Sequence, residues 1–433
     1  MLITGAELPD GRVRDVRTDE GRIAEIEDSL HSLPDEETVD ADGLTLLPGA
    51  IDAHVHFRQP GHGHKETWAT GSRSAAAGGV TTVVDQPNTS PPTVDGAAFD
   101  EKAGFADNAA VNYGINGGVN DEWEPESLLA RPVFALGEVF LADSTGEMGI
   151  DEALFEDALT EAAEAGIPVT VHAEDADLFD ESAFGTDAGG TGRDADADLW
   201  SQYRTAEAEI AAVEAACETA AEAGVQIHIA HTSTPEAVDA AAEAGMTTEV
   251  SPHHLLLSRD DLDELGTFGR MNPPLRSEAR REELYERVAD GTVDLIATDH
   301  APHTTAEKEA ELWDAPSGVP GVETMLPLLL AEVRDGGLTL ERVRDLVAAN
   351  PAERFDLTEK GRIEVGYDAD LTLVDLDDAE PARADALHTK CDWTPFEGRE
   401  AVFPELTIVD GEIVYDGRAG DRFTVGVGTN VRR

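Results

Sequence analysis

The chain of 433 residues carries 31 Lys and Arg against 90 Asp and Glu, which gives a formal net charge of −59. Its 41% of hydrophobic residues provides material for a large core and argues against a disordered acidic chain. The charge argues against nucleic acid or an anionic membrane as a partner, because both are bound by clustered Lys and Arg. No apolar run approaches the ~18 residues of a membrane-spanning helix, and the N-terminus lacks the pattern of a signal peptide. We therefore expect a soluble, cytoplasmic protein.

The acidic excess runs along the whole chain, and only five of the basic residues are lysines. Such a charge repels itself in dilute buffer, whereas about 1 M salt shortens the screening length to ~3 Å. The composition therefore predicts a halophilic protein with acidic, solvated surfaces. An ordinary acidic protein is the alternative.

The two ends of the chain contain short β-like runs separated by turns. Neither group is large enough for a core of its own. We expect them to pair into one small β-sandwich domain formed by residues 1–48 and 359–433. The runs are residues 1–8, 21–27, 43–49, 361–376 and 401–417.

Between the ends, apolar strand-like runs alternate with Ala- and Glu-rich helical patterns such as residues 151–166 and 205–224. This alternation predicts parallel βα units, and eight units predict a TIM-type (β/α)8 barrel over residues 49–358. Polar insertions at 185–198 and 304–321 follow the fifth and eighth strands, on the side where barrel active sites lie, and the second is a candidate substrate-covering loop. The strand-like runs are 50–57, 81–88, 111–119, 132–141, 168–175, 226–233, 247–255 and 293–303.

Polar side chains stand at the ends of several of these strands. His54 and His56 lie two apart and so face the same side of the first strand, while His172, His231 and Asp299 end the fifth, sixth and eighth. All five would gather at the mouth of the barrel. A single histidine there is more often structural, but four imidazoles with a carboxylate form a transition-metal ligand set, most often for zinc. Weaker candidates, equally well explained as core residues, are His228, His253 and His254.

Five segments, PGAIDAHVHFRQPG, TDHAPH, SPHHL, MNPPLR and SGVPGVET, resemble the amidohydrolase superfamily and, within its cyclic-amidase group, the dihydroorotases. The resemblance covers essentially the whole chain. The HxH and TDHAPH motifs are shared with allantoinases and hydantoinases, so they indicate the superfamily and not the substrate. Three residues narrow the choice: Arg58, where allantoinases usually carry Asn, and Asn88 and Asn272. In dihydroorotases, residues at these positions hold the carboxylate and ring of the substrate.

The resemblance implies further substrate contacts. His303 resembles a second residue on the anionic side of the substrate, and Pro320 and Gly321 resemble the segment whose backbone touches the pyrimidine ring. The physical chemistry of Arg58 agrees, since a guanidinium can donate two hydrogen bonds to a carboxylate that hydantoin-type substrates often lack. A structural ion pair is the alternative for Arg58.

The implied activity is the zinc-dependent, reversible cyclisation of N-carbamoyl-L-aspartate to L-dihydroorotate in pyrimidine biosynthesis. Asp299 is the expected catalytic residue, which moves the proton between water and the ring nitrogen. The alternatives are an allantoinase, a dihydropyrimidinase or hydantoinase, and a catalytically silent scaffold. The complete ligand set argues against the scaffold. The expected partner is a small molecule, and a homo-oligomer stays open.

One position departs from the family pattern. Many relatives bridge two zinc ions with a carbamylated lysine at the end of the fourth strand, where this chain has Glu138 and no lysine. Glutamate offers the same carboxylate nearer its backbone, so it would bridge only if the strand lay further inward; otherwise the second zinc would bind weakly or not at all. We expect Glu138 to be a metal ligand, with one or two zinc ions. The alternative is an acid at the surface, or one that contacts a metal ligand without binding the metal itself.

Overall fold

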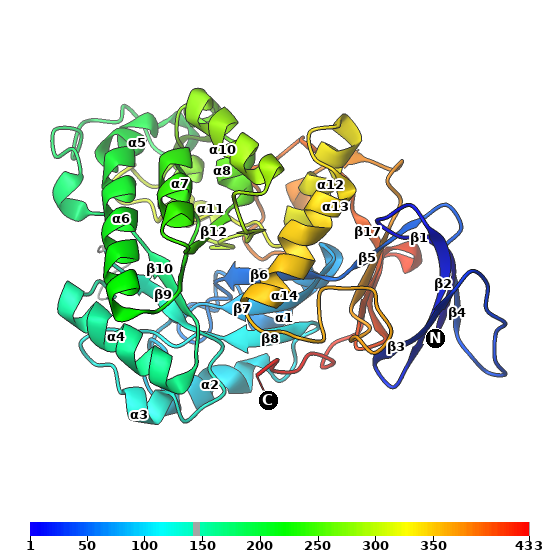
Figure 1. The fold of residues 1–433 in the computed structure, drawn as a ribbon. Helices are drawn as coiled ribbons and strands as arrows, with labels where there is room; N and C mark the ends of the chain where they lie inside the picture. Colours follow the sequence, from blue (N-terminus) through cyan, green and yellow to red (C-terminus); the bar gives the residue numbers. More distant parts are fainter. Residues whose placement is uncertain (142–147, 433) are drawn as a thin grey trace.

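The computed structural model describes residues 1–141 and 148–432 and consists of a barrel beside a β-sheet domain (Figure 1). Within these residues, eight parallel strands form two groups, β6 to β8 and β9 to β13. Isolated bridges close the ring, because Gly117 pairs with Leu136 and Val55 pairs with His300. The predicted TIM-type barrel is confirmed. Its strands are β6 (Ala50–Val55), β7 (Val80–Asp85), β8 (Asn112–Ile115), β9 (Leu136–Phe140), β10 (Val169–His172), β11 (Ile227–Ile229), β12 (Thr247–Val250) and β13 (Leu295–Ile296).

Helices cover the outside of the barrel. The two Ala- and Glu-rich patterns form α4 (Glu152–Ala165) and α6 (Ala206–Ala223). Each begins after a side chain that caps it, Asp151 or Thr205, and ends at a glycine in the left-handed conformation. The other helices are α1 (Trp68–Ala77), α2 (Gly96–Ala106), α3 (Pro125–Leu128), α5 (Asp198–Tyr203), α7 (Pro235–Glu243), α8 (Pro252–Leu256), α9 (Leu262–Leu265), α10 (Glu278–Asp290), α11 (Thr305–Lys308), α12 (Met325–Asp335), α13 (Leu340–Arg344) and α14 (Asn350–Arg354). Among the described residues, no helix combines the length and apolarity needed to cross a membrane.

Both ends of the chain contribute to one sheet, as predicted. Its nine strands, counted within the described residues, follow the order β19-β18-β17-β14-β5-β1-β2-β3, with β4 beside β1. The antiparallel pair β5 and β14 joins the two ends, with Leu46 opposite Leu373. Buried side chains such as Ile3 and Ile408 form its core. The strands are β1 (Leu2–Glu7), β2 (Val13–Asp19), β3 (Arg22–Glu27), β4 (Thr38–Asp40), β5 (Thr45–Pro48), β14 (Leu371–Val374), β17 (Pro404–Val409), β18 (Glu412–Asp416) and β19 (Arg422–Phe423), while β15 (Glu380–Pro381) and β16 (Glu400–Ala401) form a separate pair.

The end of the chain leaves this sheet and returns to the barrel (Figure 1). The amide of Tyr113 in β8 donates to the carbonyl of Thr429 at 2.9 Å, and the amide of Val431 donates to the carbonyl of Tyr113 at 2.9 Å. The tail therefore extends the edge of β8. The division at residues 48 and 359 stays a prediction about domains.

The two polar insertions pack against each other. Thr191 forms an isolated antiparallel bridge with Glu311, and the amide of Gly192 donates to the carbonyl of Ala310 at 3.1 Å. The indole of Trp313 donates to the carbonyl of Thr186 at 2.9 Å. The second insertion is therefore braced by the first, and two of its residues, Ser317 and Gly318, reach the site described below.

Candidate metal centre and active site

Buried side chains from different barrel strands converge at the carboxyl ends of those strands. His172 is the last residue of β10, while His231 and Asp299 lie just beyond β11 and β13. Both His231 and Asp299, like Arg58, adopt positive φ angles, a conformation that side chains with a Cβ rarely take and that often marks functional sites. The structure brings together every residue predicted as a ligand: His54, His56, Glu138, His172, His231 and Asp299.

Asp299 and the two histidines of the HxH motif form one half of this cluster. The Oδ1 atom of Asp299 lies 3.0 Å from His56 Nε2 and 3.6 Å from His54 Nε2. One potential ligand atom from each of the three residues lies within 4.8 Å of the others. Burial raises the pKa of Asp299, but the hydrogen bond with His56 and the charge of His54 outweigh it, so the net pKa is lowered.

The second half of the cluster consists of His172 and His231, and Glu138 lies next to both. Its Oε1 atom lies 2.6 Å from His231 Nε2 and 3.0 Å from His172 Nδ1, while Oε2 lies 3.3 Å from His54 Nε2. One carboxylate thus lies between the two groups of imidazoles. Glu138 stands in the middle of β9 and not at its end, which corrects the predicted position. Its side chain is buried, so it is no surface acid.

The ring nitrogens of the histidines suit a metal between the two halves. His54 Nδ1 donates to Glu249 at 2.7 Å, and within the described residues its buried Nε2 has no hydrogen-bond partner. His56 and His172 likewise each donate from one nitrogen to a carboxamide or carboxylate, which turns the lone pair of the other inward. Nitrogen and carboxylate oxygen are the donors that zinc prefers. The residues present therefore fit a zinc site.

Two further carboxylates, which the sequence analysis did not predict, orient the histidines. Glu249 accepts from His54 Nδ1 and from His228 Nε2 at 3.1 Å, and Glu174 accepts from His172 Nε2 at 2.9 Å. Metal-binding histidines commonly have such partners, which fix the orientation of the ring. The signal for Glu249 was a charged residue within the buried strand β12. His228 is thus a buried neighbour of Glu249.

Arg58, Asn88 and Asn272 line a small cavity together with the candidate ligands. The guanidinium of Arg58 donates to the carbonyl of Pro302 at 3.2 Å, and within the described residues no carboxylate oxygen lies within 4.0 Å of it. The alternative of a structural ion pair is therefore wrong for the described part of the chain. Burial lowers the pKa of Arg58 to about 10, so the group stays charged at neutral pH.

His303 lies beside Arg58, with Nε2 3.1 Å from the guanidinium. Its Nε2 donates to the carbonyl of Ser317 at 2.8 Å, and its Nδ1 accepts from Lys65 at 2.9 Å. Burial and the positive charge of Arg58 hold the pKa of His303 well below its usual range, so the ring is neutral. The positive charge at this corner comes from Arg58 and Lys65, and Lys65 was not predicted.

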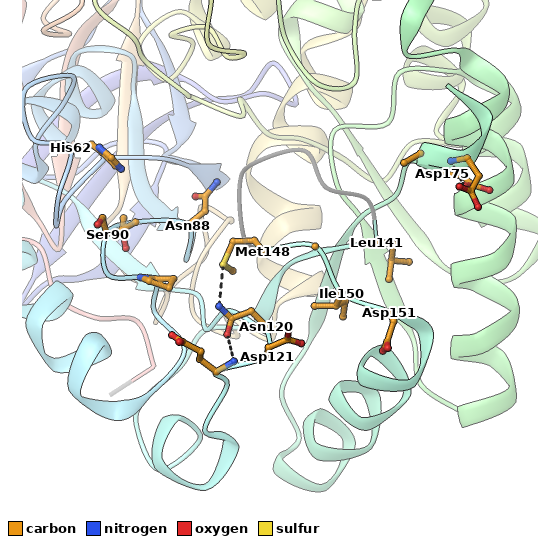
Figure 2. A pocket seen from close by; sticks show the side chains of 16 residues that line it. His62, Asn88, Ser90, Asn120, Asp121, Leu141, Met148, Ile150, Asp151 and Asp175 are labelled. Atoms are coloured by element: carbon orange, nitrogen blue, oxygen red, sulfur yellow. Dashed lines mark hydrogen bonds between the residues drawn. The ribbon is translucent and has the colours of Figure 1, made fainter. Parts of the chain in front are cut away.

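The two asparagines are oriented by neighbouring rings. His56 Nδ1 donates to Asn88 Oδ1 at 2.8 Å, and Trp200 Nε1 donates to Asn272 Oδ1 at 3.1 Å. Asn88 also lines a wider pocket of about 1120 Å³ next to the cavity (Figure 2). Acidic residues, including Asp121 and Asp175, line that pocket and would repel an anionic ligand, whereas the charge of Arg58 would attract it.

Pro320 and Gly321 lie elsewhere. They line a separate small cavity with His300, whose Nδ1 accepts from the amide of Gly321 at 3.1 Å. Ser317 and Gly318, from the same insertion, line the cavity with the ligands instead. The predicted contact of Pro320 and Gly321 with a pyrimidine ring stays a prediction.

Comparison with known proteins finds relatives of this chain and of its fold. A dihydroorotase of Halobacterium salinarum is 62% identical over 434 residues, covering 100% of both chains. A dihydroorotase of Methanosarcina mazei is 45% identical over 91% of this chain and 89% of that relative, and an allantoinase of Rubrobacter xylanophilus is 36% identical over 97% and 96%. The solved L-hydantoinase (dihydropyrimidinase) from Arthrobacter aurescens has a TM-score of 0.92 at 27% identity, over 99% of this chain and 98% of that one. Residues 45–414 match the amidohydrolase family, and the chain belongs to that family.

Proposed function

We propose that this protein is a dihydroorotase, which interconverts N-carbamoyl-L-aspartate and L-dihydroorotate in pyrimidine biosynthesis. The observation that carries the proposal is the half-buried, charged guanidinium of Arg58, which lines the cavity of the candidate ligands without a carboxylate partner in the described chain. Dihydroorotate has a ring carboxylate to pair with it, whereas allantoin and dihydrouracil have none. Relatives named dihydroorotase at 62% and 45% identity support the same activity.

The metal in this proposal is zinc, with one or two ions. His54, His56 and Asp299 would supply ligands on one side, and His172 and His231 would supply them on the other. Glu138, which lies next to imidazoles of both sides, would be a ligand between them. When bound, zinc polarises the scissile carbonyl and lowers the pKa of water.

The protein's own residues position the substrate and move its proton. Arg58, with His303 and Asn88 beside it, holds the substrate carboxylate and thereby fixes the scissile amide next to Asp299. In hydrolysis, Asp299 accepts a proton from the attacking water and delivers it to the ring nitrogen as the C–N bond breaks. Cyclisation runs the same transfers in reverse.

An assay of the zinc-loaded protein in molar KCl tests this function. Carbamoyl-aspartate, dihydroorotate, allantoin and dihydrouracil are offered separately, and we expect turnover of the first two. Preferred turnover of allantoin or dihydrouracil would instead identify the protein as an allantoinase or a dihydropyrimidinase. Loss of every activity despite bound zinc would favour a silent scaffold.

Arg58→Met is expected to weaken substrate binding more than the chemical step. Losing charge-assisted hydrogen bonds worth about 2 kcal/mol raises KM about 30-fold, with a smaller change in kcat. Steady-state kinetics on dihydroorotate measure the two constants, and Arg12→Met, at an exposed arginine, is the control. An unchanged KM would remove Arg58 from the substrate site.

The small-molecule substrate is the only partner that this function requires. We further propose a cytoplasmic location, with neither nucleic acid nor membrane as a partner, on the ground of the net charge of −59. A division into a barrel over residues 49–358 and a β domain over 1–48 and 359–433, and assembly into a homo-oligomer, belong to the same proposal.

A further inference from the structure

Strand β9 is irregular where it carries Glu138. In its pairing with β10, Leu136 lies opposite Val169 and Val139 lies opposite Val171, so β9 contains one extra residue. Gly137 has a φ of +140°, which favours glycine, and a Cβ there would overlap Thr170. Such a bulge bends the strand, re-aims a side chain and leaves a backbone amide without its regular ladder partner.

The side chain of Gln86, the residue after β7, holds this bulge. The amide of Glu138 donates to Gln86 Oε1 at 2.9 Å, and Asn116 Nδ2 donates to the same oxygen at 3.0 Å. The Nε2 atom of Gln86 donates to the carbonyl of Ala53 in β6 at 3.3 Å. Because Gln86 is only 1% exposed, water does not compete for these contacts.

Gln86 is itself anchored on both sides of its backbone. Its amide donates to the carbonyl of Val55 at 2.9 Å, and its carbonyl accepts from Lys102 Nζ at 2.5 Å. Lys102 is fully buried and also pairs with Asp85 at 2.7 Å. The anchor for β9 is therefore fixed to two neighbouring strands and to helix α2.

We propose that Gln86 is a positioning residue for Glu138. It holds the bulged backbone of β9 where both carboxylate oxygens of Glu138 reach the imidazoles at 2.6 to 3.3 Å. Metal ligands must be placed within about 0.5 Å, so a strand that relaxed outward would withdraw the carboxylate. This inference rests on the proposed role of Glu138 as a zinc ligand.

A double-mutant cycle on zinc affinity tests the proposal. Gln86→Met keeps the length of the side chain and removes the acceptor, so we expect zinc affinity to fall about 10- to 100-fold, as for other residues that orient ligands. In a Glu138→Ala background the same change has no further effect, because nothing remains to be positioned. Competition with a chromophoric chelator measures the affinities of the full-length protein in molar KCl.

Thr82→Val is the matched control. Thr82 is buried in β7, and within the described residues its hydroxyl has no hydrogen-bond partner, so zinc affinity should match wild type. If Gln86→Met does not fold, Gln86→Asn, whose carbonyl is one methylene short, takes its place with the same expected loss. The refolded, metal-free variants are compared by thermal unfolding.

The outcomes distinguish the positioning role of Gln86 from the ligand role of Glu138. An equal loss of zinc affinity from Gln86→Met with and without Glu138 would make Gln86 a general support and overturn the proposal. Zinc affinity unchanged by Gln86→Met but lowered by Glu138→Ala would also overturn it, with the ligand role of Glu138 intact. Zinc affinity unchanged by Glu138→Ala would remove that ligand role itself.

Discussion

Asp299→Asn is expected to reduce turnover by at least about 10³-fold while substrate binding stays measurable, because proton transfer by a placed carboxylate contributes about 10² to 10⁴. Asparagine suits this position, since Asp299 has a φ of +46° and asparagine tolerates the left-handed region best among residues with a Cβ. Its amide NH2 can donate a hydrogen bond to the lone pair of His56 Nε2, but the side chain no longer takes up a proton.

Turnover of dihydroorotate and calorimetric binding of carbamoyl-aspartate measure the two effects, and zinc content is determined for each protein. Zinc content serves as the internal control, because Asp299 is also a candidate ligand. A variant that loses zinc is compared at saturating zinc. Normal turnover in Asp299→Asn would contradict its role in proton transfer.

The barrel and the positions of the candidate ligands were predictable because their signals are local. A run of apolar residues marks each strand, and a polar residue at its end marks the mouth of the barrel, as for His172 in β10. No such signal exists for contacts between distant segments. The pair formed by His54 and Glu249 joins residues 195 positions apart, and only the closed ring of strands brings them together.

Loop geometry limited the prediction of the substrate side. Residues 304–321 read as one polar insertion, and nothing in their sequence distinguishes Gly318, which lines the cavity, from Gly321, which donates to His300. The bulge at Gly137 was equally hidden, because a glycine inside a strand predicts a bulge or a close approach but not its direction.

The few lysines of the chain are mostly buried or half-buried in the structure. Of the five lysines, Lys102 and Lys308 are fully buried, Lys360 is 9% exposed, and Lys65 is half-buried beside His303, while Lys390 is exposed.

The enclosed ammonium groups have protein partners. Lys308 donates to three backbone carbonyls, and Lys360 lies 2.5 Å from Asp370. The lysines that remain are thus mostly those enclosed by the protein, and the surface relies on carboxylates and arginine.

Glu138→Ala is expected to lower zinc content and to reduce turnover by about 10²-fold or more, because its carboxylate contacts imidazoles of both halves of the cluster. Elemental analysis of protein dialysed against buffered zinc gives the content per chain. Glu156→Ala, which removes an exposed acid on α4, controls for the change in charge and should bind zinc as wild type does.

The change in zinc content on going from wild type to Glu138→Ala distinguishes the possible roles of Glu138. A fall from two zinc ions to one would mean that Glu138 bridges a pair, because His54, His56 and Asp299 still form a ligand set on their own. A wild-type content of one ion that falls in the variant would mean a single site shared by both halves. Unchanged content would exclude Glu138 as a ligand, and the buried carboxylate would then serve only to orient His172 and His231.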